Sequence, residues 1–385
     1  MKKKIKLFAA TTLHRADDHR IYHKEICSLL NDYDVTLLCS EDKIPKEFTS
    51  AINIEAIKSE ESKLSRIKMI LRIVRRLLRE KNSIVIFHDF ELIYAILLLR
   101  VFAGSNIYIF DMHEDYPSQI LISKKIPILF LPLLSLFLMF SEMLLLPLFD
   151  WLFVADGFLE KKYGDMMNLR ITAIYNFPEF TEIKRHVKSE SELNLVYAGG
   201  IYFERGLKEL VEIASRLKNS KLHLFGRTYT KMENDYLEEA LKKNSNLIYH
   251  GLTPYDDLMK ILPSMDIGLV MMKPNKKFRR NISVKQFDYM LSGIPVIIQK
   301  GLVSFVKDYE NGFNVSSVED AVSRINNLTA KDSARMSDNA ISLIKEKYNW
   351  EYESKKIKSA LEYLIILKGV SELQELHQDC QEKHL

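Results

Sequence analysis

The chain has 385 residues, of which 47% are hydrophobic and 28% are charged. This composition excludes a disordered or collagen-like protein, and the length predicts two domains. The formal net charge of +4 is too small to indicate a nucleic-acid-binding protein, so no nucleic acid is expected as a partner.

The three cysteines, Cys27, Cys39 and Cys380, are far apart and form no C-x-x-C pair. They predict neither a disulfide framework nor a zinc site, and they fit a reducing cytoplasm. The basic start Met1–Lys4 precedes an apolar run, Ile5–Ala10, that is too short for a secretory signal. We expect this run to form the first buried strand.

The first half of the chain alternates short apolar runs with helical patterns, which is typical of a parallel sheet covered by helices. The expected elements are strand Ile5–Ala10, helix Asp18–Leu30, strand Val35–Cys39, a helix from Lys63, strand Ile84–His88, a helix from Phe90, strand Ile107–Asp111, the apolar stretch Ile126–Phe149, and strands Trp151–Ala155 and Ile171–Tyr175. They predict one doubly wound, Rossmann-like α/β domain over residues 1–178.

Residues 179–192 are charged and lack apolar periodicity, so they predict an interdomain linker. The alternation then restarts and predicts a second doubly wound domain over residues 193–347. Its expected elements are Leu193–Ala198, Leu207–Leu217, Lys221–Phe225, Lys231–Lys242, Leu247–His250, Tyr255–Leu262, Ile267–Met271, Val284–Leu291 and Pro295–Ile298. Open parallel sheets bind ligands beyond the carboxyl ends of their strands, so the site is expected in a cleft between the domains.

Several common motifs are missing. Neither G-x-G-x-x-G nor G-x-x-x-x-G-K-[ST] occurs, which argues against dehydrogenases and P-loop nucleotidases. His19 and His23 have the i, i+4 spacing of metal ligands, but Arg15 and Arg20 lie beside them and would repel a cation. The sequence therefore predicts no metal site.

Polar segments follow three expected strands of the first domain. Residues 13–25 follow the first strand, His88 and Asp89 end the third, and His113 and Glu114 follow the fourth. Histidines and carboxylates at neighbouring strand ends favour a functional site over isolated structural hydrogen bonds.

These segments resemble GT-B glycosyltransferases of the retaining family four, in which D-x-R-I-(aromatic)-x-K-E follows the first strand. The matching residues are Asp18, Arg20, Ile21, Tyr22, Lys24 and Glu25. The resemblance implies that His113 is the active-site histidine facing the donor sugar. It also implies an acceptor-binding set of Asp18, Arg20, His88, Asp89 and Glu114.

A glycine turn and a cation follow the first strand of the second domain, where glycines permit close backbone approach to a phosphate. The family usually reads G-R-x-x-x-x-K-G here, and its Arg and Lys grip the diphosphate. In this chain Gly199 begins the motif, Gly200 replaces the Arg, and Arg205 stands at the Lys position. Gly226, after the next strand, is also expected in the donor site.

Residues 279–297 resemble the family block N-x-x-x-K-x-F-E-Y-M-x-x-G-x-P-V-I most closely. Ser283 is expected to cap a helix, with Val284 beside it, while Lys285 contributes charge to the phosphate site. Asp288 replaces the family's glutamate and is expected to accept hydrogen bonds from ribose hydroxyls. Arg280 stands where the family has another glutamate.

Basic charge is concentrated between Lys63 and Lys81, where eight Lys and Arg residues accompany one acidic residue, Glu80. As a helix, this segment has an apolar face and an arginine face. The arginines either face solvent or contact an anionic membrane surface, and we favour the membrane. The stretch 126–149 is interrupted by prolines and Glu142, so it predicts either a partly inserted segment or a buried core helix rather than a membrane span.

The resemblance covers residues 5 to about 365 and implies a GT-B fold, with residues 348–385 crossing back to the first domain. It implies a retaining glycosyltransferase that needs neither metal nor cofactor, in which Arg205 and Lys285 stabilise the leaving diphosphate. The donor would be a nucleotide diphosphate sugar, and the acceptor a saccharide or lipid-linked saccharide of bacterial capsule, lipopolysaccharide or exopolysaccharide synthesis. We expect the protein in the cytoplasm, peripheral on the inner face of the cell membrane.

Two alternatives remain open. A nucleotide-sugar epimerase can share the two-sheet architecture and would consume donor without an acceptor. A catalytically silent nucleotide-sugar-binding partner subunit is suggested by the departures at Gly200, Arg280 and Asp288.

Overall fold

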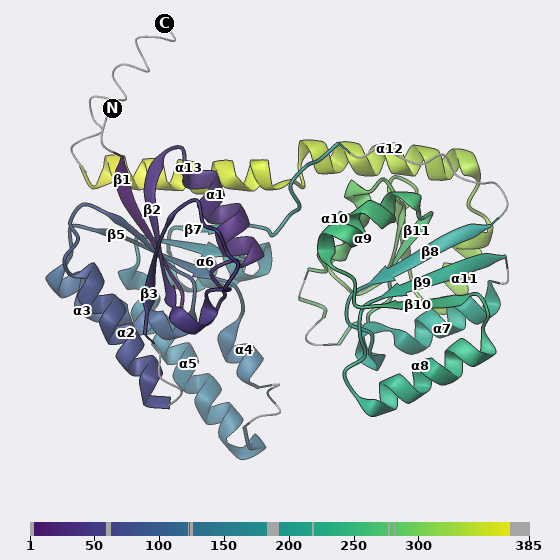
Figure 1. Cartoon of the computed structure of the whole chain (residues 1–385), viewed down its shortest axis with the longest axis horizontal. Coiled ribbons are helices and arrows are strands. Elements are labelled where there is room, and N and C mark those ends of the chain that lie inside the picture. Colours follow the sequence, from purple (N-terminus) through teal and green to yellow (C-terminus); the bar gives the residue numbers. More distant parts are fainter. Residues whose placement is uncertain are drawn as a thin grey trace, which may run out of the picture. The chain divides into compact units, whose positions relative to one another are not determined.

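The computed structural model describes residues 4–58, 63–121, 123, 126–182, 192–217, 219–275, 278–280 and 282–369. The chain forms two compact units, one of Met1–Asn176 with Glu353–Leu385 and the other of Phe177–Tyr352 (Figure 1). Of the expected linker, residues 183–191 lie outside the described part of the chain.

The first unit is built on a seven-stranded parallel sheet in the order β3-β2-β1-β4-β5-β6-β7. The strands are β1 Ile5–Ala10, β2 Tyr33–Ser40, β3 Asn53–Ile57, β4 Ile84–Phe87, β5 Ile107–Met112, β6 Trp151–Val154 and β7 Ile171–Ala173. The order reverses between β1 and β4, and ligands bind at such a switch point beyond the carboxyl ends of the strands.

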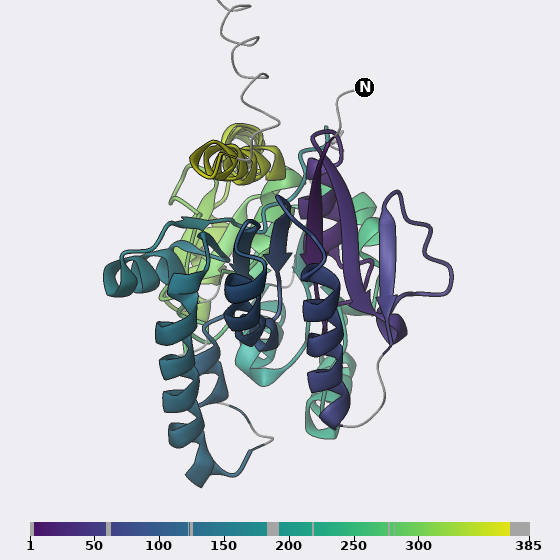
Figure 2. The same cartoon turned by 90° about the vertical axis from the view of Figure 1, so that its left-hand side faces the viewer.

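Helices cover both faces of this sheet. They are η1 His19–Ile26, α1 Cys27–Leu29, η2 Glu41–Lys43, α2 Lys63–Leu77, η3 Phe90–Tyr94, α3 Ala95–Phe102, α4 Tyr116–Ile120, η4 Ile128–Phe130, α5 Leu131–Leu145, η5 Leu146–Leu148, α6 Gly157–Met167 and α13 Trp350–Leu367. In Figures 1 and 2, α2, α3 and α5 lie side by side on one face. Ile73, Ile96 and Leu145 from these three helices are buried in one apolar core with the strands.

From Glu353 onward, α13 belongs to the first unit although it follows the second in sequence. The Glu353 carboxylate accepts a hydrogen bond from the backbone N–H of Tyr175 (3.0 Å) and pairs with Lys356 (2.8 Å). Lys358 forms an ion pair with Asp32 at 2.8 Å. These contacts attach the last described helix to the first unit near β2 and β7.

The second unit has a six-stranded parallel sheet in the order β10-β9-β8-β11-β12-β13. Its strands are β8 Leu193–Ala198, β9 Ser220–Phe225, β10 Leu247–Gly251, β11 Ile267–Val270, β12 Val296–Gln299 and β13 Gly312–Val315. Its helices are η6 Phe203–Arg205, α7 Leu207–Arg216, α8 Lys231–Lys243, α9 Tyr255–Ile261, η7 Leu262–Ser264, α10 Lys285–Leu291, α11 Val318–Asn326 and α12 Ala330–Glu346. The order reverses between β8 and β11, so the ends of these strands are the corresponding switch point.

Candidate functional site

The sequence predicts a regular α-helix in the segment after β1, but this segment begins as the π-helix η1. The Asp18 carboxylate accepts hydrogen bonds from the backbone N–H groups of Arg20 (2.9 Å) and Ile21 (3.0 Å), which fixes the helix start. The wider π turn leaves Arg20, Lys24 and Glu25 all buried, and π turns are common at functional sites. Asp18 therefore shapes the site through the backbone.

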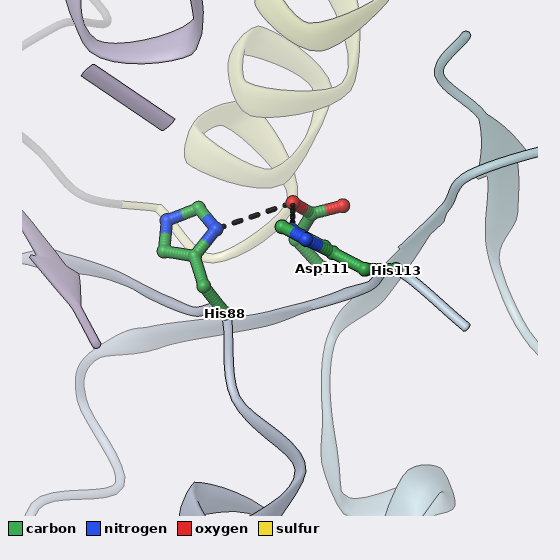
Figure 3. Close-up of side chains that lie close together, drawn as sticks. All are labelled: His88, Asp111 and His113. Carbon is green, nitrogen blue, oxygen red and sulfur yellow. Dashed lines mark hydrogen bonds and ion pairs between the residues drawn. The ribbon is translucent and has the colours of Figure 1, made fainter. Parts of the chain in front are cut away.

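Asp111, near the end of β5, is the centre of a buried polar network (Figure 3). Its Oδ2 lies 2.6 Å from His113 Nε2 and 3.2 Å from His88 Nδ1, and its Oδ1 accepts from Arg20 Nη2 at 2.9 Å. Arg20 Nε donates to Glu25 Oε1 at 2.9 Å. One carboxylate thus orients both histidines and the arginine.

The charges in this network determine its protonation. Burial opposes ionisation of Asp111, but Arg20 and His113 outweigh it and hold the pKa of Asp111 well below its usual range. Burial and the charge of Asp111 raise the pKa of Glu25 well above its usual range. Because ionised Asp111 can only accept, the facing nitrogens His113 Nε2 and His88 Nδ1 carry the protons. When neutral, His113 then has Nδ1 as its acceptor nitrogen.

Asp89, at the end of β4, ties down the backbone after β1. Its Oδ2 accepts from Thr11 Oγ1 (2.6 Å), Thr12 N (2.6 Å) and Leu13 N (3.0 Å), while Oδ1 lies 2.8 Å from His14 Nδ1. Burial opposes ionisation of Asp89, but His14 and the hydrogen bonds outweigh it and lower its pKa. The hydrogen bond to Asp89 also raises the pKa of His14. Asp89 therefore positions the loop more than it offers a free ligand.

His88, Asp111 and His113 also form the kind of cluster that holds a metal ion, because one donor atom from each lies within 4.8 Å of the others. The same atoms already face one another in the hydrogen bonds around Asp111 Oδ2, and Arg20 supplies a positive charge to Oδ1. In this arrangement protons on the two histidines and on Arg20 satisfy the Asp111 carboxylate, whereas the buried His88 Nε2 has no hydrogen-bond partner among the described residues.

In the second unit, two cations converge at the end of β8. Lys285 Nζ and Arg205 Nη1 lie 2.9 Å and 3.4 Å from the point that a Cβ on Gly199 would occupy. Lys285 is 9% exposed, and within the described part of the chain its Nζ has no hydrogen-bond partner. The nitrogen instead lies 4.2 Å from the centre of the Tyr197 ring.

Burial and the nearby charge of Arg205 lower the pKa of Lys285 to about 7, although Asp288 partly opposes the effect. A buried, unpaired amine beside a second cation is unfavourable by itself. An anion between the two would remove this cost. The pair therefore has the electrostatics of a phosphate site.

Glycine is required at two points of this site. Gly199 has φ +127°, and a side chain there would fill the space in front of the two cations. Gly226, at the end of β9, has φ +144°, and its Cβ would lie 1.9 Å from the carbonyl oxygen of Gly199. The two turns pack backbone against backbone, which no other residue permits.

The other expected donor residues are placed as follows. The cap at Ser283 is not formed, because α10 begins one residue later, after Val284, and no side chain caps it. Val284 is exposed, Gly200 follows Gly199 in the turn, and Asp288 Oδ1 accepts from Tyr255 Oη at 2.9 Å. Asp288 is thus held by a tyrosine.

The structure does not bring every predicted residue together. Glu114 is exposed and takes no part in the Asp111 network, whereas Arg20 and His88 do. Asp111 and Glu25 were missing from the predicted site. The sequence feature that could have identified them is a carboxylate in or beside an otherwise apolar segment, because a buried carboxylate needs a charged partner.

Residues 195–357 match the family model described as "Glucosyltransferase 3-like, C-terminal domain". No curated protein shows significant similarity to the sequence. Sucrose-phosphate synthase from Thermosynechococcus elongatus superposes with a TM-score of 0.71 at 12% identity, over 94% of this chain and 100% of that one. The lipopolysaccharide outer core galactosyltransferase WaaB superposes with a TM-score of 0.67 at 14% identity, over 93% and 99%.

The chain has the GT-B fold. The fold prediction made from the sequence is confirmed, including both doubly wound parallel sheets. Anabaena HepE, solved in complex with UDP-glucose, has the same fold, with a TM-score of 0.62 at 12% identity over 93% of this chain and 100% of that one. In this GT-B chain the Asp111 network belongs to the N-terminal sheet and the two cations to the C-terminal sheet.

Proposed function

We propose that this chain is a retaining, metal-independent glycosyltransferase whose C-terminal unit binds a nucleotide diphosphate sugar. The observation that carries the proposal is the convergence of Lys285 and Arg205 in front of Gly199. A diphosphate supplies the negative charge that Lys285 and Arg205 lack between them, and it is also the leaving group of sugar transfer. Both cations would stabilise the charge that develops as the glycosidic bond to phosphate breaks.

The family match and the fold support the same donor class. The matched region, residues 195–357, contains both cations and both glycine turns. HepE, a structural neighbour, has been solved with UDP and with UDP-glucose. Asp288, held by Tyr255, is the proposed partner of the ribose hydroxyls.

The N-terminal network supports a role in sugar positioning. His113 is fixed by Asp111 so that its second nitrogen is an acceptor in the neutral ring. We assign to it the orientation of a donor-sugar hydroxyl. Of the predicted acceptor residues only Glu114 is exposed, so the acceptor would meet Glu114 and the loop after β1, which Asp18 and Asp89 position through the backbone while Arg20 and His88 lie buried beneath it.

The proposed acceptor is a saccharide or lipid-linked saccharide of bacterial surface polysaccharide synthesis, handled at the cytoplasmic face of the membrane. The neighbours WaaB and WaaG, both described with lipopolysaccharide, support this class of acceptor.

The test is sugar transfer by the purified full chain, using UDP-, GDP- and ADP-sugars with membrane lipid extract in the presence of EDTA. Sugar in the lipid fraction, with the anomeric configuration of the donor retained by NMR, is the expected result. Lys285→Ala should reduce transfer at least 100-fold, whereas Lys242→Ala, which removes an exposed lysine on α8, should leave it unchanged.

Other outcomes overturn the proposal. Conversion of the donor sugar without an acceptor would identify an epimerase. Donor binding without hydrolysis or transfer would identify a silent binding subunit. Transfer abolished by EDTA and restored by a divalent ion would refute metal independence.

A further inference from the structure

The most exposed apolar surface of the first unit is the helical segment η4–α5–η5, Ile128–Leu148. Among the described residues it is the one helical segment that is long and apolar enough to cross a membrane, with 21 residues and a mean hydropathy of 2.2 over its most apolar stretch. Only 22% of its most apolar window is buried. The alternative of a buried core helix is therefore wrong for most of this segment.

The carboxyl-terminal part of the segment is fixed in the protein. Leu145 and Leu146 are buried, and Glu142 accepts a hydrogen bond from Tyr163 Oη at 2.7 Å. Ser141 Oγ accepts from Tyr94 Oη at 3.1 Å. This end cannot leave the unit without breaking buried polar contacts.

The amino-terminal part projects beyond the sheet, at the lower end of α5 in Figures 1 and 2. Ile128 and Leu129 are 84% and 82% exposed, and Leu133, Phe137 and Phe140 are also exposed. Residues 128–140 span roughly 20 Å as a helix, which is shorter than the ~30 Å hydrocarbon core of a bilayer. Leu131 is buried and Ser135 Oγ donates to Pro117 O at 2.8 Å, so this part stays attached to α4 while its exposed side chains can enter one leaflet.

The neighbouring helices extend the same surface. Val101 and Phe102 of α3 and Ile67 and Leu71 of α2 are large apolar side chains that are exposed. Helix α3 lies between α5 and α2 on this face of the sheet. Exposed large apolar side chains on several helices of one face favour an interaction surface.

Charge indicates the partner. The exposed cations of α2 are Arg66, Lys68, Arg72 and Arg75, and Arg79 follows in the turn after the helix; of these, Arg66 also lies 3.6 Å from Glu91. Arg76, on the same helix, is not part of this set because it is paired with Glu55 (2.7 Å) and Glu80 (2.6 Å). Cations beside exposed apolar side chains match the anionic headgroups and acyl chains of a membrane. A second copy bound by the same face would bring two basic helices together.

We propose that this helical face docks the protein onto an anionic membrane, with the exposed apolar side chains of residues 128–140 inserted into one leaflet and the α2 cations at the headgroups. The docking does not depend on the proposed transferase activity.

The experiment is flotation of the full chain with vesicles of phosphatidylcholine alone or with 30 mol% phosphatidylglycerol. The apolar variant is Ile128→Ser, Leu129→Ser and Phe137→Ser, all at exposed positions, and its control is Met232→Ser with Ile366→Ser. The charge variant is Arg75→Gln with Arg79→Gln, and its control is Lys231→Gln with Lys242→Gln on α8.

The wild type and both controls should float with anionic vesicles. The apolar variant should bind at least tenfold more weakly, with an unchanged melting temperature. The charge variant should bind about 30-fold more weakly to anionic vesicles, and this difference should disappear at 1 M salt.

Wild-type protein that stays unbound with both vesicle types overturns the proposal, as does equal binding by the apolar variant. Concentration-dependent dimers that the apolar variant abolishes, with no vesicle binding, would assign the surface to a second copy instead.

Discussion

Replacement of Lys285 by Met should stabilise the ligand-free protein while removing donor binding. The side chain is buried, so methionine keeps most of the packing and eliminates the amine. Its pKa of about 7 in the fold compares with 10.5 in the unfolded chain. Between these values the unfolded chain holds a proton that the folded chain lacks, so stability rises with pH from about 7 to 10.5.

The magnitude follows from the pKa difference. At pH 8 the difference between the pH and the unfolded-chain pKa of 10.5 corresponds to about 3 kcal/mol by which the buried amine destabilises the folded wild type. Lys285→Met should recover this amount, which raises the melting temperature of a domain of this size by about 6–12 °C. The gain should vanish near pH 10.5. Lys242→Met, at an exposed lysine of α8, should show no such pH dependence.

Donor binding provides the second measurement. A diphosphate beside Lys285 should restore its charge, so binding of UDP at pH 8 should take up close to one proton. Calorimetry in HEPES and in Tris buffer, neither of which contains phosphate that would compete for the site, measures this uptake from the difference between the two binding enthalpies. A variant no more stable than wild type at pH 8, or a binding enthalpy independent of buffer, would refute the reasoning.

Two further predictions each compare two neighbouring residues. Asp111→Asn leaves the buried Arg20 without its ionised partner, so it should lower the free energy of unfolding by about 3 kcal/mol or more and abolish turnover. Glu25→Gln should lower it by less than about 1 kcal/mol, because burial already favours the protonated carboxyl. Urea denaturation and transfer assays of both variants test the contrast, and equal losses would contradict it. Gly226→Ala should prevent soluble expression or lower the free energy of unfolding by more than about 3 kcal/mol. At Gly251 an added Cβ meets nothing within 4 Å, so Gly251→Ala should lower it by about 1 kcal/mol. Similar melting temperatures for the two variants would show that the Gly226 contact relaxes.

The two-sheet fold was predictable because buried parallel strands are continuous apolar runs, as in β4 and β11. Strand β3 was missed because it lies at the sheet edge and is only partly buried, so Asn53 and Glu55 break its apolar pattern. Strand β13 was missed as well, because Gly312 and Asn314 weaken its signal.

The site was predictable only in outline. Resemblance to a family pointed to Lys285 and Arg205. It did not reveal that Lys285 Nζ has no hydrogen-bond partner among the described residues, because this depends on the packing around Gly199. Asp111 was overlooked because its strand is otherwise apolar, and its three partners come from separate segments. The π-helical start of η1 was not predictable from a period of 3.6 residues.

The position of α13 has a consequence for synthesis of the chain. Trp151 packs against Tyr363, and Lys368 pairs with Asp150 at 2.9 Å, so the first sheet is completed by residues translated more than 200 positions later. The second unit, Phe177–Tyr352, is continuous and emerges from the ribosome entire before that helix arrives. During synthesis from the amino terminus, the second unit should therefore be able to complete its fold before the first unit, which still lacks α13.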